Sequence, residues 1–312
     1  MELLNQLFNM KKIAQSIVVA LTLAIVTPSV CQLPNTHVYC FDMDKFGEQI
    51  DLKNCRFLTS FNPLGYNNQP QWINNNELYI AVQTPYDTSQ TEIYSLSLLT
   101  NVLTQVTATR ESEYSPTLAP DRKSISCIRV DATRAGTQRL WTYPLDRNDA
   151  GRDLLPLHQD IGYHCWLSDK KLALFIVNGN KNSLKLVNVE DQSSIQLSGG
   201  IGRSLGRMND GKLAFVQKAT ADTWFIKSMD PNTYATEIII QTLPGSEDFT
   251  LLPDGTFLMG SGSKIFSYKF GTPLKQWTEI ADLSKFGVLN IKRLTINRDL
   301  DKIAIVSDNY RR

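Results

Sequence analysis

The chain has 312 residues, of which 32 are Lys or Arg and 31 are Asp or Glu, so its formal net charge is +1. With this balance and no run of basic residues, the sequence lacks the positive field that binding to phosphate backbones requires, and nucleic acid is not an expected partner. Apolar residues at 42% and aromatic residues at 9% indicate a folded rather than a disordered protein.

The N-terminal 31 residues have the pattern of a secretory signal peptide. Lys11 and Lys12 precede an apolar stretch over residues 13–26, and small or neutral residues follow up to Cys31. Met10 is a second candidate for the initiating residue. A transmembrane anchor is the less favoured alternative, because the apolar run is shorter than the roughly 20 residues that span a bilayer.

Cleavage after Cys31 is the preferred outcome and leaves Gln32 first. Lipid attachment to Cys31 is the less favoured alternative, because Val30 is a poor neighbour for that processing. We therefore predict an exported protein, periplasmic or secreted, with no integral span after cleavage and one domain over residues 32–312.

The first two strands predicted after this segment are His37–Asp42 and Arg56–Thr59. From residue 72 onward, a short β-type run that is interrupted by a polar turn recurs six times. The first apolar residues after these turns are Leu78, Ile125, Leu172, Leu213, Phe257 and Ile303, at intervals of 47, 47, 41, 44 and 46 residues. We call these six the register residues. A strand repeat of this period is typical of a β-propeller.

Each of the first five runs is followed by another apolar alternation, which predicts the third strand of a four-stranded blade. These segments are Glu92–Leu96, Arg139–Tyr143, Leu184–Asn188, Trp224–Ser228 and Lys264–Tyr268. Weaker fourth strands are predicted beyond them, for example at Thr104–Thr107 and Ile195–Leu197.

The last copy has two strands and ends near Val306, whereas the two N-terminal strands match the third and fourth strands of the other copies. The sequence therefore predicts an all-β, six-bladed propeller of four-stranded antiparallel blades, closed by pairing the N-terminal strands with the C-terminal strands.

Four cysteines follow the signal segment: Cys40, Cys55, Cys127 and Cys165. Cys40 and Cys55 flank one predicted hairpin, and whether they form a disulfide is left open because spacing does not determine pairing. Cys127 lies within an apolar strand and is expected to be a buried side chain. No CxxC motif or histidine cluster is present, so no structural zinc site is predicted.

One copy carries a family likeness. The segment Tyr114–Lys123, followed by Ile125–Ile128 and by Gln138–Trp141, resembles the repeat of TolB-type propellers, in which Ser-Pro, a spacer and Pro-Asp-Gly-Lys precede an apolar strand. Arg122 replaces the glycine of that repeat. The turn proline is kept in two copies, as Pro120 and Pro253.

The resemblance implies an exported bacterial protein that binds a peptide, a protein or a glycan through a central funnel. In a propeller, the residues just before each inner strand converge on the mouth of the central channel, where a concave ligand site can form. In this chain they form a mixed set of polar side chains: Asn68-Gln69, Glu113-Tyr114, Tyr163-His164, Arg203-Ser204, Glu247-Asp248 and Lys292-Arg293. The residues predicted to bind a ligand are Gln69, Glu113, Tyr114, His164, Arg203, Asp248 and Lys292.

His164 is the weak candidate for a catalytic residue, as a general base oriented by Glu113 or Asp248. The favoured alternative is a hydrogen-bonded structural imidazole beside Trp166. The segment Gly202–Gly206 matches the G-x-S-x-G pattern of a nucleophile elbow, but no histidine follows Ser204 in the chain and a strand is predicted where the elbow needs a helix.

No cofactor and no metal site are predicted, although a calcium site of Glu113, Glu247 and Asp248 is left open. The leading hypothesis is an exported, TolB-like, non-catalytic binding or scaffold module for a peptide, a protein or a glycan at the central funnel. The alternative is a hydrolase or lyase that acts there through His164, an acidic neighbour and Arg203.

Overall fold

The computed structural model describes residues 33–84, 87–131, 136–179 and 181–308. The predicted signal peptide over residues 1–31, with Met10 and Cys31, lies outside these residues. In the described part of the chain, no helix is long and apolar enough to span a membrane.

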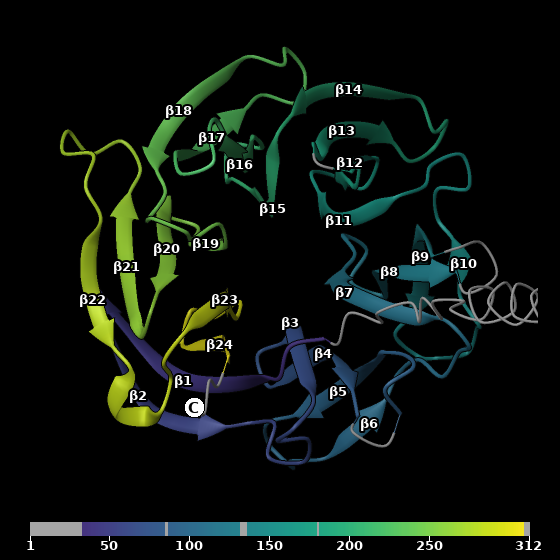
Figure 1. The fold of residues 1–312 in the computed structure, drawn as a ribbon, viewed down its shortest axis with the longest axis horizontal. Helices are drawn as coiled ribbons and strands as arrows, with labels where there is room; N and C mark the ends of the chain where they lie inside the picture. Colours follow the sequence, from purple (N-terminus) through teal and green to yellow (C-terminus); the bar gives the residue numbers. More distant parts are fainter. Residues whose placement is uncertain (1–32, 85–86, 132–135, 180, 309–312) are drawn as a thin grey trace, which may run out of the picture. The chain divides into compact units, whose positions relative to one another are not determined.

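The unit that begins at Pro34 is a β-propeller of six four-stranded antiparallel sheets (Figure 1), as predicted. The strands of the first three blades are β3(Tyr66–Asn74), β4(Glu77–Gln83), β5(Glu92–Ser97) and β6(Leu103–Gln105); β7(Ser112–Leu118), β8(Ser124–Asp131), β9(Thr137–Pro144) and β10(Arg152–Asp153); and β11(Ile161–Trp166), β12(Lys171–Ile176), β13(Ser183–Asn188) and β14(Ser194–Gly199). The next two blades contain β15(Ile201–Arg207), β16(Leu213–Lys218), β17(Trp224–Met229) and β18(Thr236–Gln241); and β19(Phe249–Leu251), β20(Thr256–Ser261), β21(Lys264–Lys269) and β22(Thr278–Asp282), after which η1(Ser284–Phe286) leads to the last blade.

The sixth blade combines the two ends of the described chain, as predicted. Its strand order is β2(Gln49–Phe57), β1(Thr36–Phe46), β24(Lys302–Asp308) and β23(Ile291–Ile296). In Figure 1, the purple β1 lies beside the yellow β24, and their antiparallel register runs from Thr36 opposite Asp308 to Asp42 opposite Lys302. The ring is therefore closed by main-chain hydrogen bonds, which leave neither of these strands with a free inner edge.

The hydrophobic core is divided among the seams between neighbouring blades. Alternate residues of β1 serve two seams, because successive side chains of a strand point to opposite faces. Phe41 packs with Leu258 of the fifth blade, whereas Val38 packs with Leu78 of the first blade. The closing strands thus hold both neighbouring blades by apolar burial as well as by backbone pairing.

The fourth strand of the closing blade differs from the sequence prediction. It covers Gln49–Phe57 and overlaps the predicted Arg56–Thr59 in only its last residues. A tight turn at Gly47, where φ is +62°, returns the chain directly after β1, so the fourth strand starts earlier than expected.

All four described cysteines have free thiols. Cys40 faces the seam with the first blade, whereas Cys55 packs against the seam with the fifth blade. The two side chains lie on opposite faces of one sheet, which is why their hairpin does not join them. Cys127 is fully buried, as predicted.

Two phenylalanines of β1 test how much the closing blade depends on this burial. Phe41 is fully buried, whereas Phe46 is 73% exposed. We expect Phe41→Ala to lower the free energy of unfolding by about 3–5 kcal/mol, and Phe46→Ala to change it by less than about 0.5 kcal/mol. Urea denaturation of the full chain measures both values, and equal losses would contradict the described packing of β1.

Candidate functional site

A cavity of about 180 Å³ lies where the six inner strands meet. Every blade contributes side chains to its wall, and most of these are polar or charged. Four of the seven predicted ligand-binding residues line it: Gln69, His164, Arg203 and Asp248.

One position of the repeat faces this cavity in all six blades. Each register residue pairs with a residue near the end of the inner strand, as Leu78 does with Trp72 and Ile303 does with Ile296. The residues three positions before these partners are Gln69, Ser115, Tyr163, Ser204, Asp248 and Arg293, and all six line the cavity.

Irregular pairing sets which side chains turn inward. Five of the six inner strands shift register against their neighbour in the same blade, as bulged strands do. Gln69 and Ser115 lie within two of these irregularities, with φ near +54° and +53°. A side chain in such a segment cannot be assigned to a face by simple alternation.

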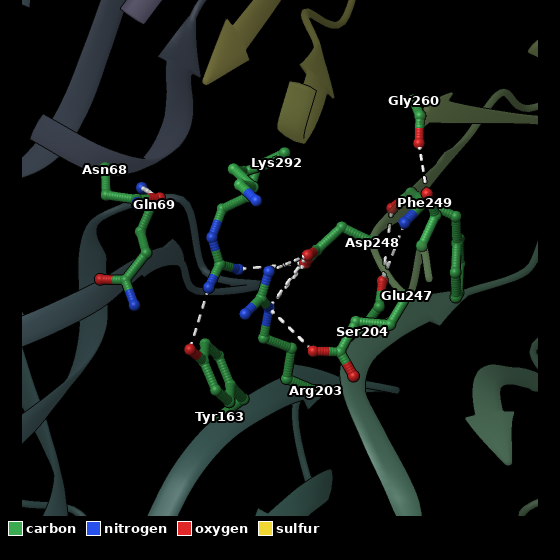
Figure 2. Close-up of polar contacts among 12 residues, drawn as sticks. Asn68, Gln69, Tyr163, Arg203, Ser204, Glu247, Asp248, Phe249, Gly260 and Lys292 are labelled. Carbon is green, nitrogen blue, oxygen red and sulfur yellow. Dashed lines mark hydrogen bonds and ion pairs between the residues drawn. The ribbon is translucent and has the colours of Figure 1, made fainter. Parts of the chain in front are cut away.

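An ion-pair network occupies one side of the cavity. Arg203 donates through Nε to both Asp248 oxygens, at 3.2 and 2.9 Å, and its Nη2 also contacts Asp248 Oδ2. Arg293 donates to Asp248 Oδ1 at 3.3 Å and to the Tyr163 hydroxyl at 2.9 Å. Figure 2 shows Arg203 between the two acidic side chains Asp248 and Glu247, with Gln69 on the opposite side. The network joins the third, fourth, fifth and sixth blades.

Both arginines keep their charge in this partly buried setting. Burial acts to lower the pKa of Arg203, but attraction to Asp248 outweighs it, so the pKa is raised. For Arg293, burial is again outweighed, here by Tyr163 and Asp248. The cavity wall is therefore permanently cationic at these two positions.

The Gly202–Gly206 segment is part of strand β15 and has a structural role. Ser204 Oγ accepts a hydrogen bond from the backbone N–H of Phe249 at 3.2 Å, across the seam to the next blade. A Cβ atom on Gly202 would lie 2.9 Å from Glu247 Oε2, so this glycine lets the carboxylate approach. Glu247 in turn forms ion pairs with Arg203 at 3.4 Å and with Lys218 at 2.7 Å.

His164 lines the cavity but makes its hydrogen bond away from any acid. Its Nε2 atom lies 2.7 Å from Ser126 Oγ, which also accepts from Trp166 Nε1 at 2.9 Å. Burial lowers the pKa of His164 to about 3, so the imidazole is uncharged at neutral pH. This arrangement matches the imidazole beside Trp166 that the sequence favoured.

Glu113, Tyr114 and Lys292 are not among the residues that line the cavity. Tyr114 packs edge-on against Tyr66 of the first blade, with ring centroids 6.4 Å apart. Lys292 forms an ion pair with Asp308 at 3.0 Å, and its neighbour Arg293 faces the cavity instead. The bulge between Ile291 and Arg293 explains this exchange of neighbours.

Glu113 is buried in the seam between the first two blades. Its Oε1 atom accepts from Thr109 at 2.6 Å, and its carboxyl group lies against that of Glu92. The Oε2 atoms of both groups have no other partner in the described residues, so a single shared proton satisfies both. Burial raises the pKa of Glu113 to about 8, and the repulsion from Glu92 adds to the rise.

Four residues at this repeat position line the cavity but were missed among the predicted binders: Ser115, Tyr163, Ser204 and Arg293. The signal that finds them is the fixed offset from the register residues, rather than closeness to the start of each strand. In the described residues, no group of three or more His, Cys, Asp or Glu side chains is placed to hold a metal ion.

No protein-family model and no curated protein matches the sequence. Solved structures share the fold. A protein from Agrobacterium tumefaciens assigned to TolB superposes with a TM-score of 0.63 at 11% identity, covering 88% of this chain and 98% of that one. TolB from Acinetobacter baumannii gives 0.53 at 14% identity, covering 87% of this chain and 63% of that one, less than two thirds of its length.

An oligogalacturonate lyase from Vibrio parahaemolyticus is also similar, with a TM-score of 0.51 at 12% identity and coverage of 89% of this chain and 99% of that one. These likenesses establish that the chain has a TolB-like six-bladed propeller fold.

Removing the one aspartate of the central ion-pair network should strongly lower the free energy of unfolding. Asp248→Asn leaves Arg203 and Arg293 without their shared counter-charge, and we expect a loss of about 2–4 kcal/mol in the free energy of unfolding. The matched control is Asp210→Asn, which removes an exposed ion pair with Lys212 and should cost less than about 0.5 kcal/mol. Urea denaturation distinguishes the two, and similar small losses would show that the network is not structurally important.

The shared proton predicts a pH dependence of stability. The pKa of Glu113 is about 8 in the folded protein, whereas its ordinary value is 4.5. Protonated Glu113 therefore contributes fully to the free energy of unfolding below about pH 4.5, and this contribution is lost as the pH rises toward 8. We expect Glu113→Gln, whose amide can donate to Glu92, to be more stable than the wild type at pH 9 by about 3–5 kcal/mol. Thermal unfolding between pH 5 and pH 9 measures this, with the exposed Glu279→Gln as control.

Proposed function

We propose that this chain is an exported, non-catalytic binding or scaffold module that recognises a peptide, a protein or a glycan at the central cavity. The observation that carries the proposal is the convergence of one repeat position from all six blades on a single polar cavity. Packing alone would be served by small or apolar residues there, and the observed wall instead contains two arginines, an aspartate, two glutamines, a histidine and a tyrosine.

The cavity is built to hold its shape rather than to form on binding. Arg203, Asp248, Arg293 and Tyr163 fix one another's side chains, and Gln69 Oε1 accepts from the Ser115 backbone N–H at 2.8 Å. Preorganised polar groups reduce the ordering cost of binding, which favours recognition of a defined chemical group.

Export is supported by the sequence of residues 10–31, which has the charged start, apolar run and small-residue exit of a signal peptide. We place the mature protein in the periplasm or outside the cell. Its TolB-like fold is consistent with a binding module, and the partner it would bind there is part of the proposal.

A second candidate function is catalysis at the same cavity, by a hydrolase or a lyase. It is supported by the similarity in fold to a protein named as an oligogalacturonate lyase, and by the place of His164 in the cavity wall. The contacts of His164 favour binding over catalysis, because a general base is most effective when its own pKa lies near neutral pH. This imidazole is hydrogen-bonded to Ser126, and burial lowers its pKa to about 3.

Capture of the ligand tests the site without assuming its chemistry. Thr295 lines the cavity, and Thr295→Phe would fill part of it with a side chain of no charge. We expect the tagged full chain to capture a species from cell-envelope extract. We expect the Thr295→Phe variant to capture at least about tenfold less of that species. The control is Thr236→Phe on the exposed strand β18, which should capture normally.

Normal capture by a folded Thr295→Phe variant would place the site on another face and refute the proposal. Turnover of the captured species by the wild type, abolished by His164→Gln, would support the catalytic alternative instead. Retained binding without turnover supports the binding module.

A further inference from the structure

Three polar residues of the cavity wall keep hydrogen-bonding groups that the protein does not use. Ser115 Oγ and His164 Nδ1 are buried and have no partner in the described residues, with their residues 9% and 8% exposed. Gln69 is 9% exposed, and its amide oxygen is occupied by Ser115 while no acceptor for its amide nitrogen is found in the described part of the chain. Leaving a buried polar group without a partner is unfavourable, so this wall is complete only with a ligand or ordered water.

The hydrogen bonds of Ser126 determine what His164 offers. Ser126 Oγ accepts from Trp166 Nε1 at 2.9 Å, so its own proton must go to His164 Nε2 at 2.7 Å or to the Thr117 carbonyl at 3.5 Å. The shorter contact is the stronger one, which makes Nε2 the acceptor. In the neutral ring the proton is then on Nδ1, which is a donor.

The opposite side of the cavity also presents donors. Arg203 is occupied by Asp248 and Glu247. Arg293 uses Nη1 for Asp248 and Nη2 for Tyr163, which engages two of its five N–H groups. The unused groups of the cavity wall are thus predominantly donors, from Gln69, Ser115, His164 and Arg293.

The charge of the wall limits what can complete it. Arg203, Arg293 and Asp248 are the charged residues that line the cavity, so its formal charge is +1. A singly charged acceptor neutralises this wall, whereas a doubly charged phosphate would leave an excess negative charge beside Asp248. The volume of about 180 Å³ equals about six water molecules at roughly 30 Å³ each, which suits a carboxylate with a short chain of carbons.

We propose that the cavity binds a monoanionic carboxylate of the ligand, held by Arg293 and by the donors of Gln69, Ser115 and His164. This inference rests on the proposed function, because it names the group that the binding module recognises. The uncharged amide of the same ligand should bind more weakly, because an amide presents one acceptor oxygen in place of two and has no negative charge to attract Arg293.

Butyrate and butyramide are matched probes, because they have the same number of heavy atoms and differ in charge. Isothermal titration calorimetry with the full chain should show saturable binding of butyrate in the millimolar range, and at least about tenfold weaker binding of butyramide. Arg293→Gln should weaken butyrate binding by at least about tenfold. Its neighbour Lys292, which pairs with Asp308 away from the cavity wall, is the control, and Lys292→Gln should change the affinity by less than about twofold.

Equal affinities for butyrate and butyramide, or no saturable butyrate binding by the wild type, would overturn the inference without any variant. These wild-type measurements remain decisive if Arg293→Gln does not fold. The outcome is distinct from that of the capture experiment. If capture depends on Thr295 but butyrate does not compete with it, the carboxylate proposal is refuted and the binding module is retained. If butyrate binds but capture does not depend on Thr295, the proposed site of the binding module is refuted.

Discussion

The antiparallel pairing of β1 with β24 is the constraint on which the rest of this structure depends. It converts a row of blades into a ring, and it does so with two strands whose alternate side chains enter both neighbouring seams. Ile303 and Ile305 serve one seam while Ala304 and Val306 serve the other. This closure holds the six inner strands around a common centre, where the cavity lies.

Closure also concentrates charge. Residues that are about 45 positions apart in sequence, such as Arg203 and Asp248 or Asp248 and Arg293, become direct partners because the ring brings equivalent positions of successive blades together. In this partly buried setting each side chain needs its partners, so the network stabilises the fold and fixes the geometry of the cavity at the same time. The same side chains therefore serve stability and recognition.

The sequence predicted the architecture well because the repeat appears in several independent signals, namely period, turn residues and alternation. Strand β4 with Leu78 and strand β24 with Ile303 lie where the repeat placed them. The site was predicted only in part, since bulges in the inner strands break simple alternation: Arg293 faces the cavity and Lys292 does not. Glu113 could not be placed from sequence, because its partner Glu92 belongs to another blade.

We propose that ligand recognition occurs in the cavity at the ring's centre. A crystal structure of the full chain with its captured ligand tests this most directly. We expect ligand density in the cavity, with a carboxylate in contact with Arg293 and Gln69. Ligand density on an outer strand or between two blades, with only water in the cavity, would contradict it.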